Sequence, residues 1–427
     1  MFSALAGGFL GLALVKFGNP SILDHFIAAP TTLLEVIFQP WPFSWALGGL
    51  GVVLMAAWTV MRWRPATRHW AVWLPLAWFG WQLVAAVFTS EPRLTRLVLP
   101  HFGGVVVSFY LGLLALARVR WMKGFWIGLL IGFGIMTWMG IDQHYGGLEA
   151  TRRAVYAQPG WEQMSPEFLK RIGSQRIFAT LLYPNALAGA LLLLTPALGV
   201  ATWRLTAGRN PRIQLVLTAL LAWAGLACLV WSGSKAGWLI ALAMGIVVLL
   251  RLELGRRIRL LLLLTVAVGG LTGFALKFSG YFARGATSVS ARFDYWNAAG
   301  KTFQAHPWVG SGPGTFAESY RRLKPPEAEM AKLAHNDYLQ QASDSGWPGA
   351  LAYTAFVVTS LVWLRRRCWD DGLRFAVWLG LVGWGLQSFV EFGLYLPAIG
   401  WTAFWLLGWL WGLALAGNRI DNAHRTP

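Results

Sequence analysis

The chain has 427 residues, of which 56% are hydrophobic and only 13% are charged. A soluble fold of this size could not bury so much apolar side chain, so a lipid bilayer has to form part of its solvent. The formal net charge is +18, but the Lys and Arg residues are scattered between apolar runs, which argues against nucleic acid as a partner. The two cysteines, Cys228 and Cys368, imply neither a disulfide framework nor a metal cluster.

Apolar runs long enough to cross a bilayer recur along the chain. A transmembrane helix needs roughly 20 apolar residues, and about twelve such runs can be marked by their charged or Gly/Pro-rich boundaries. They lie near residues 2–17, 42–61, 70–89, 98–117, 124–142, 179–202, 213–232, 235–250, 260–277, 347–364, 375–393 and 397–416. The first run lacks a charged leading region and a cleavage site, so we expect a retained helix, and the polar, Pro-interrupted stretch 18–41 is expected along the membrane interface. The sequence therefore predicts an all-α integral membrane protein with one polytopic domain over residues 1–427.

Basic residues alternate between the loops that join these runs. Because Lys and Arg in short loops resist translocation, the basic loops and both termini are predicted to face the cytoplasm. These residues are Arg62, Arg64 and Arg68; Arg118, Arg120 and Lys123; Arg204, Arg209 and Arg212; Arg251, Arg256, Arg257 and Arg259; and Arg365, Arg366, Arg367 and Arg374. The opposite side receives two long polar segments, 143–178 and 278–347. We expect the functional residues in these two external segments.

His335 is the first candidate for chemistry, in the polar stretch from Ala334 to Leu339. A neutral imidazole can accept a proton from a hydroxyl group near neutral pH, which makes it a candidate general base. An exposed or helix-capping histidine is the alternative, and the residue type alone favours it.

The stretch 325–345, which follows Pro325 and Pro326, is predicted to be a helix at the membrane surface. One face of this helix would carry apolar side chains and another would carry polar ones. The apolar face holds Leu333, Tyr338, Leu339 and Ala342, and the polar face holds Lys332, Asn336 and Gln340.

Two basic side chains near the predicted outer boundary could bind phosphate. Arg292 precedes Trp296 by one helical turn, and its forked guanidinium could grip phosphate oxygens. A snorkelling arginine beside an interfacial tryptophan is the alternative. Lys235 follows the short turn 232–234, where its ammonium could meet a lipid headgroup or a fixed diphosphate.

Glu391 lies at the outer end of the apolar run 375–393, where an unpaired carboxylate is expensive. It is therefore expected to have a cationic partner. The candidates are Lys235, Arg292 and Arg176, which ends the first external segment. Such a pair would orient a cation toward phosphate, although a purely structural ion pair fits the sequence equally well.

Other motifs exclude some familiar chemistry. The stretch from Gly310 to Gly314 has no following Lys-Ser/Thr and no preceding strand, so it predicts a tight turn rather than a nucleotide P-loop. Ser232 and Ser234 have no histidine at helical spacing, which argues against a serine nucleophile. Because no external DxD pair or His/Cys cluster occurs, neither a catalytic metal nor another cofactor is expected.

Five short stretches match, in content and in order, those of the bacterial O-antigen ligase family. The chain resembles that family and its relatives, the O-antigen polymerases and the protein O-oligosaccharyltransferases. The stretches are Tyr183 to Ala188, Ser232 to Gly237, Arg292 to Trp296, His306 to Phe316 and His335 to Leu339. They span roughly residues 176–349, while the first five runs match the family only in being apolar.

The resemblance implies a metal-independent, inverting membrane glycosyltransferase of the C type. It would lie in the bacterial inner membrane with its active site facing the periplasm. The donor would be a glycan linked to undecaprenyl diphosphate, and membrane lipids would surround its tail. The acceptor would be a hydroxyl group of the lipid A core or of another glycan.

The resemblance also assigns roles to residues. The family's general base carries over onto His335, and its diphosphate-binding arginine onto Arg292, with Lys235 and Arg176 beside it. Lys235 stands where the family usually has Arg, so the charge is kept but the bidentate fork is lost. The acidic residue of the second-last helix is matched by Glu391. Supporting roles are expected for Tyr338, Asn185 and Trp296.

The acceptor decides between related activities. A lipid A core sugar makes the protein a ligase, a growing glycan makes it a polymerase, and a Ser or Thr side chain makes it a protein O-oligosaccharyltransferase. Chain length and a single long loop near the end favour the ligase. A transporter of lipid or glycan would share the helix count. It would, however, be expected to carry charged residues at the bilayer midplane and paired interrupted helices, and the sequence shows neither feature clearly.

Overall fold

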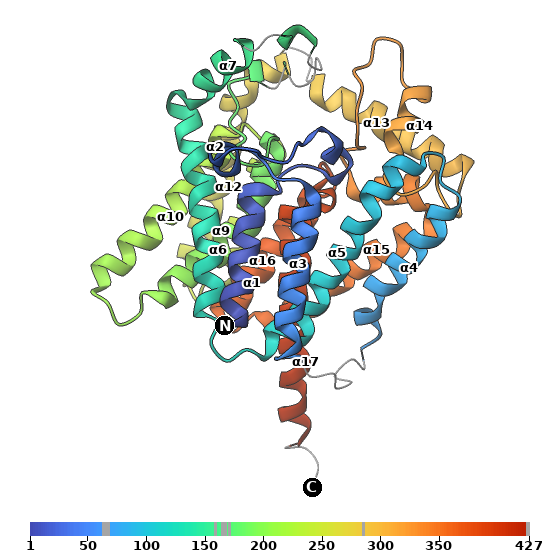
Figure 1. The fold of residues 1–427 in the computed structure, drawn as a ribbon. Helices are drawn as coiled ribbons and strands as arrows, with labels where there is room; N and C mark the ends of the chain where they lie inside the picture. Colours follow the sequence, from blue (N-terminus) through green and yellow to red (C-terminus); the bar gives the residue numbers. More distant parts are fainter. Residues whose placement is uncertain (62–68, 158–159, 164–168, 170–171, 284–286, 424–427) are drawn as a thin grey trace.

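The computed structural model describes residues 1–61, 69–157, 160–163, 169, 172–283 and 287–423, which form helices joined by turns (Figure 1). The helices are α1 (Phe2–Lys16), α2 (Leu33–Phe38), α3 (Phe43–Trp58), α4 (Leu74–Val87), α5 (Pro92–Leu114), α6 (Lys123–Asp142), α7 (Leu148–Tyr156), α9 (Pro184–Leu205), α10 (Pro211–Trp231), α11 (Lys235–Arg251), α12 (Arg256–Ala283), α13 (Thr287–Ala305), α14 (Phe316–Leu323), α15 (Asp337–Cys368), α16 (Gly372–Gln387) and α17 (Pro397–Ala423). These described ranges contain no β-strand, which confirms the predicted all-α class.

The predicted apolar runs coincide with helices. Each of the twelve runs overlaps one helix of the bundle. Among the described residues, eight helical segments are long and apolar enough to cross a membrane, while α1 and α3 are apolar but shorter. The chain is therefore an integral membrane protein, and the number of twelve crossings stays a prediction.

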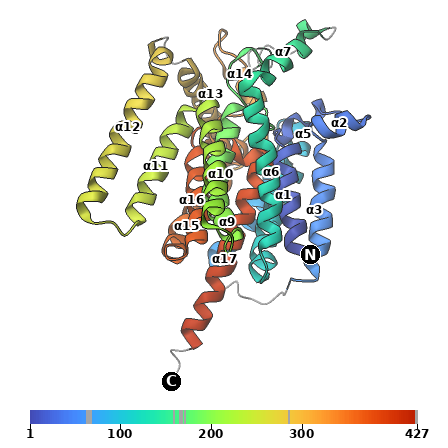
Figure 2. The same ribbon diagram turned by 90° about the vertical axis from the view of Figure 1, so that its left-hand side faces the viewer.

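Successive long helices run in opposite directions, so their connections gather at two ends of the bundle (Figure 1). The N-terminus of α1 and the C-terminal end of α17 lie at the same end, and α7, α13 and α14 lie at the other (Figures 1 and 2). We call the first the basic end and the second the polar end. Which of them faces the cytoplasm stays a prediction.

Two arginines from the loops predicted to be basic make contacts across the basic end. Arg204 pairs with Asp371 at 3.0 Å, and Arg251 Nε donates to the carbonyl oxygen of Trp369 at 2.7 Å. These contacts join three loops that are far apart in the sequence. Three other members of the predicted basic set lie outside the described residues: Arg62, Arg64 and Arg68.

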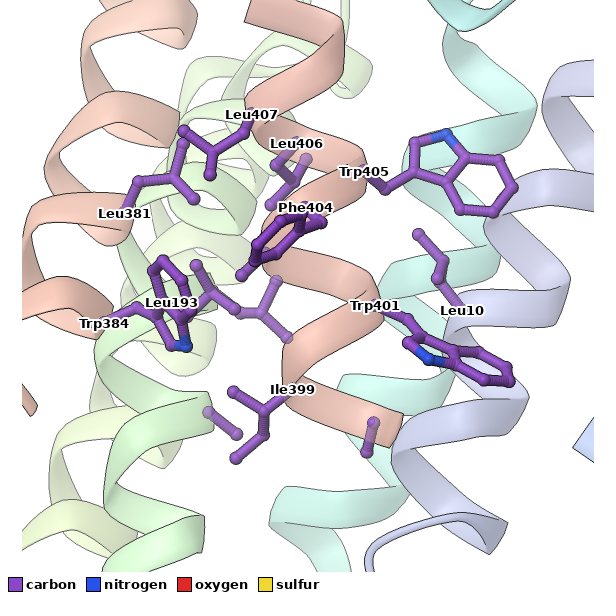
Figure 3. Close-up of a cluster of buried hydrophobic side chains, with 14 of the residues drawn as sticks. Leu10, Leu193, Leu381, Trp384, Ile399, Trp401, Phe404, Trp405, Leu406 and Leu407 are labelled. Atoms are coloured by element: carbon purple, nitrogen blue, oxygen red, sulfur yellow. The ribbon is translucent and has the colours of Figure 1, made fainter. Parts of the chain in front are cut away.

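Helix α17 packs at the centre of the bundle. It lies along α5, while α1 lies along α6 and α16 along α9. The side chains of Trp401 and Phe404 are fully buried, and Figure 3 shows them beside Leu10 of α1, Leu193 of α9 and Trp384 of α16. This packing fixes the polar-end termini of α9, α16 and α17 relative to one another.

Helices α11 and α12 form a hairpin that leans away from the other helices (Figure 2). The two helices pack together, and Trp238 Nε1 donates to the carbonyl oxygen of Gly270 at 3.2 Å. No residue in the most apolar stretch of α12 is buried, as is typical of a helix that faces lipid on most sides. At the polar end, Lys235 at the start of α11 nevertheless contacts Tyr281 near the end of α12.

Helix α15 begins later than the sequence predicts. The predicted helix 325–345 was wrong before Asp337, because residues 325–336 form turns and bends. The Oδ1 atom of Asn336 accepts a hydrogen bond from the backbone N–H of Leu339 at 3.0 Å, which caps the helix. The backbone of His335 is left-handed, with φ of 50°, so it cannot continue a helix. Gln340 is fully buried, not on an exposed polar face.

The direction of α15 changes at Gly346. Its backbone has φ of 69° and ψ of −174°, a region open essentially to glycine alone. A Cβ atom at this position would also collide with the carbonyl oxygen of Trp308. The kink therefore requires glycine.

Gly346→Ala is expected to destabilise the protein by about 1–3 kcal/mol, because alanine is strained in this backbone conformation. The measurement is thermal unfolding of the purified protein in detergent. Gly134→Ala is the matched control, since a Cβ atom at Gly134 in α6 meets nothing within 4 Å. Equal melting temperatures for Gly346→Ala and the unchanged protein would contradict this prediction.

Candidate active site

His335 and Glu391 meet at the polar end of the bundle. His335 Nδ1 lies 3.1 Å from Glu391 Oε2. Helix α16 ends at Gln387, before the end of the apolar run 375–393, so Glu391 lies in the connection to α17. The imidazole is partly exposed, whereas the carboxylate is buried. A buried carboxylate thus supports an imidazole that solvent and substrate can reach.

The charge of Glu391 determines which nitrogen of His335 can act as a base. Burial raises the pKa of this carboxyl, but His335 and Arg292 outweigh burial and hold the pKa below its ordinary value of 4.5. An ionised carboxylate only accepts hydrogen bonds, so Nδ1 carries the proton of neutral His335. The Nε2 atom then keeps its lone pair and can accept a proton.

The ring of His335 is held on two sides. Tyr295 stacks against the imidazole, with ring centroids 5.6 Å apart, and Phe392 meets it edge-on at 4.8 Å. The left-handed backbone of His335 belongs to a region in which histidine, asparagine and aspartate are the most tolerated residues after glycine. Backbone conformation and ring contacts therefore fix the imidazole before any substrate arrives.

The second oxygen of Glu391 binds Arg292 and Asn185. Arg292 Nη2 and Asn185 Nδ2 each lie 2.5 Å from Glu391 Oε1. Arg292 also donates from Nε to the carbonyl oxygen of Val390 and from Nη1 to that of Ser288, both at 3.1 Å. These bonds engage three of the five N–H groups of a guanidinium. Glu391 thus has the cationic partner that was predicted from its place at the end of an apolar run. The remaining N–H groups of Arg292 are left for a ligand.

Arg176 reaches the same carboxylate through Asn185. Its Nη2 atom donates to Asn185 Oδ1, and its Nε atom donates to the carbonyl oxygen of Ser232, both at 2.7 Å. Asn185 lies in the first turn of α9. A single amide therefore links Arg176, at the end of the polar segment 143–178, to Glu391.

Lys235 lies near this group but makes a different kind of contact. It is the first residue of α11, whose N-cap is Ser234: the Ser234 Oγ atom accepts a hydrogen bond from Gly237 N at 3.2 Å. Its Nζ atom lies 3.6 Å from the ring centroid of Tyr281 and 5.4 Å from that of Phe278. Within the described ranges it has no carboxylate partner.

Two other expected residues do not contact the His335–Glu391 pair. Trp296 packs edge-on against Phe293 and belongs to a small apolar cluster that joins α13 and α14 to the stretch 330–339. The Tyr338 hydroxyl donates to the carbonyl oxygen of Gly385 at 2.9 Å and so joins α15 to α16. Their positions suit structural support, and any direct role in binding stays a prediction.

Asp337 is a site residue that sequence reasoning missed. Its backbone N–H donates to the carbonyl oxygen of Ser388 at 2.8 Å, and its Oδ2 atom accepts from the N–H of Leu394 at 3.0 Å. Asp337 therefore holds both ends of the connection that carries Glu391. Its only signal in the sequence was its place within the stretch from His335 to Leu339.

The stretch from Gly310 to Gly314 forms the predicted tight turn. Gly310, Gly312 and Gly314 all have positive φ values, which glycine adopts without strain. The turn docks on α15, where the buried Asp344 accepts a hydrogen bond from the N–H of Gly314 at 2.9 Å. The shape of this turn is thus tied to the helix that begins beside His335.

The assembled group suits acid–base chemistry on an anionic substrate. Arg292 pairs with Glu391, Arg176 reaches it through Asn185, and Lys235 lies near both arginines. These three cations and one carboxylate together carry a net charge of about +2 when His335 is neutral. A positioned base beside cations of this kind can deprotonate a nucleophile while phosphate oxygens are neutralised. No cluster of three or more His, Cys, Asp or Glu side chains with metal-site geometry occurs in the part of the chain that the structure describes.

One family of known proteins matches part of the chain. Residues 220–354 match a family model described as O-antigen ligase. The matched range contains Lys235, Arg292 and His335, while Arg176, Asn185 and Glu391 lie outside it. A search of curated proteins gave no match.

Proposed function

Because residues 220–354 match the O-antigen ligase family model, we propose that this chain is a membrane glycosyltransferase of that family and acts as an O-antigen ligase. Its donor is a glycan linked to undecaprenyl diphosphate, and its acceptor is a hydroxyl group of the lipid A core oligosaccharide. The enzyme lies in the bacterial inner membrane with both termini in the cytoplasm. The polar end of the bundle then faces the periplasm, and no metal takes part.

The observation that supports this proposal most is the shared carboxylate of Glu391. One of its oxygens contacts the imidazole of His335 and the other contacts the guanidinium of Arg292. A base and a phosphate-binding cation are therefore held side by side by one group. Transfer from a diphosphate to a hydroxyl group needs both at the same place.

In the proposed reaction, the donor's diphosphate lies beside Arg292, Lys235 and Arg176. The Nε2 atom of His335 takes the proton of the acceptor hydroxyl while the acceptor oxygen attacks the anomeric carbon. The bond between that carbon and the diphosphate oxygen breaks, and the cations neutralise the charge that develops on the leaving group. Attack from the opposite face inverts the anomeric configuration. The products are the glycosylated acceptor and undecaprenyl diphosphate.

Expression in a Gram-negative strain that lacks its own ligase tests the acceptor. We expect restored capping of the lipid A core, visible as high-molecular-weight lipopolysaccharide on a gel, and no capping by a His335→Asn variant expressed at the same level. Longer chains that stay on the lipid carrier would identify a polymerase instead. Glycosylated Ser or Thr side chains would identify a protein O-oligosaccharyltransferase. A strain with none of these three products would contradict the proposed activity.

A further inference from the structure

Lys235 is held by an aromatic surface of α12. Its ammonium lies over the ring of Tyr281, 3.6 Å from the centroid, with the ring of Phe278 at 5.4 Å. A cation at this distance from a ring face is attracted by the ring quadrupole, and the attraction grows when the pair is removed from water. The contact fixes a side chain that would otherwise rotate about four carbon–carbon bonds.

Whether Lys235 can still bind an anion depends on the group that holds its ammonium. A carboxylate would neutralise the ammonium and compete with phosphate for it. An aromatic ring leaves the charge in place and leaves N–H donors free for an anion. Lysine lacks the planar fork that fixes an arginine against phosphate, so its position has to be set by something else.

Tyr281 also connects Lys235 to the rest of the site. Its hydroxyl oxygen lies 2.6 Å from Ser288 Oγ, and the carbonyl oxygen of Ser288 accepts a hydrogen bond from Arg292 Nη1. Arg292 in turn pairs with Glu391. Tyr281 therefore joins the tip of the α11–α12 hairpin to the residues around His335.

We propose that Tyr281 is a positioning residue for the donor: its ring holds the Lys235 ammonium, still charged, at the place where the diphosphate binds. This inference rests on the proposed function, because it assumes that Lys235 binds the donor's diphosphate. The hairpin of α11 and α12 then contributes to the site through one cation–ring contact, although most of it faces away from the other helices.

The test is equilibrium binding of undecaprenyl diphosphate to the full-length protein in nanodiscs. We expect Tyr281→Leu to weaken binding by about tenfold, because it removes a cation–ring contact between two partly buried side chains. Tyr281→Phe keeps the ring and should bind within about threefold of the unchanged protein. Phe274→Leu is the matched control, since Phe274 lies on the same helix and packs on Phe278 and Phe282 rather than on Tyr281, and it should bind as the unchanged protein does.

A double variant separates positioning from general damage to the helix. In a Lys235→Met background there is no ammonium to hold, so Tyr281→Leu should cause no further loss of binding. An equal loss in both backgrounds would overturn the inference, as would normal binding by Tyr281→Leu when Lys235→Met binds weakly. Normal binding by Lys235→Met would instead overturn the donor site of the proposed function, and this inference with it.

Discussion

Replacing His335 with asparagine is expected to lower the rate of glycan transfer by about 10²- to 10⁴-fold, the contribution of a positioned general base. Asparagine suits the test because it tolerates the left-handed backbone found at His335. It also cannot take a proton from a hydroxyl group. The loss should therefore appear in kcat, with binding of undecaprenyl diphosphate largely kept.

The measurement is transfer of a labelled lipid-linked glycan by purified protein. His335→Ala serves as a second variant, and thermal unfolding of both shows whether the fold survives. A histidine outside the site gives the control: His25 lies in the Ser21–Phe26 turn beside α2, and His25→Asn should leave transfer unchanged. If either His335 variant were fully active at normal expression, His335 could not be the base.

The second large effect is expected at Glu391. Glu391→Gln keeps the size of the side chain but removes the charge that orients His335 and pairs with Arg292. An amide can also donate to Nδ1 and thereby favour the wrong tautomer of the imidazole. We expect a loss of transfer of about 10- to 100-fold, the usual cost of removing a group that orients a functional histidine.

Glu391→Ala should be worse for folding as well, because it leaves the mostly buried guanidinium of Arg292 without its carboxylate partner. Breaking a buried pair in this way costs about 3–5 kcal/mol. The comparison of thermal unfolding and transfer rates for the two variants separates these effects. Transfer by Glu391→Gln at the rate of the unchanged protein would show that the carboxylate does not orient His335.

The lowered pKa of Glu391 also fixes the sign of a pH effect. A carboxyl whose pKa is lower in the folded state contributes stability that is complete above its ordinary value of 4.5. That contribution is lost as the pH falls through the folded-state pKa. Thermal unfolding should therefore show no pH-dependent change from Glu391 between about pH 6 and pH 9, because the carboxyl is ionised in both the folded and the unfolded protein over that range.

Much of the architecture was open to prediction from the sequence, for a simple physical reason. Each helix that crosses a bilayer must satisfy its own backbone hydrogen bonds, so long apolar runs have few alternatives. The same argument found Glu391, because a carboxylate beside an apolar run has to be paired. The expected cation was narrowed to three candidates, and the structure selects Arg292 together with His335.

The errors and omissions have local causes. The helix predicted over 325–345 failed because periodicity does not reveal that Asn336 is a cap or that His335 is left-handed. Tyr281 was missed because an aromatic residue at the end of an apolar run usually indicates packing or an interface. Asp337 was missed because its role depends on the 388–394 connection, which lies about fifty residues further along the chain.

The two hydrogen bonds of Asp337 reduce the entropic cost of binding the substrate. They fasten the start and the end of the 388–394 connection to α15, so this segment loses its conformational entropy while the protein folds. Binding then does not have to order it, and affinity for the lipid-linked donor is not reduced by that cost. Catalysis can begin from a carboxylate that is already in place.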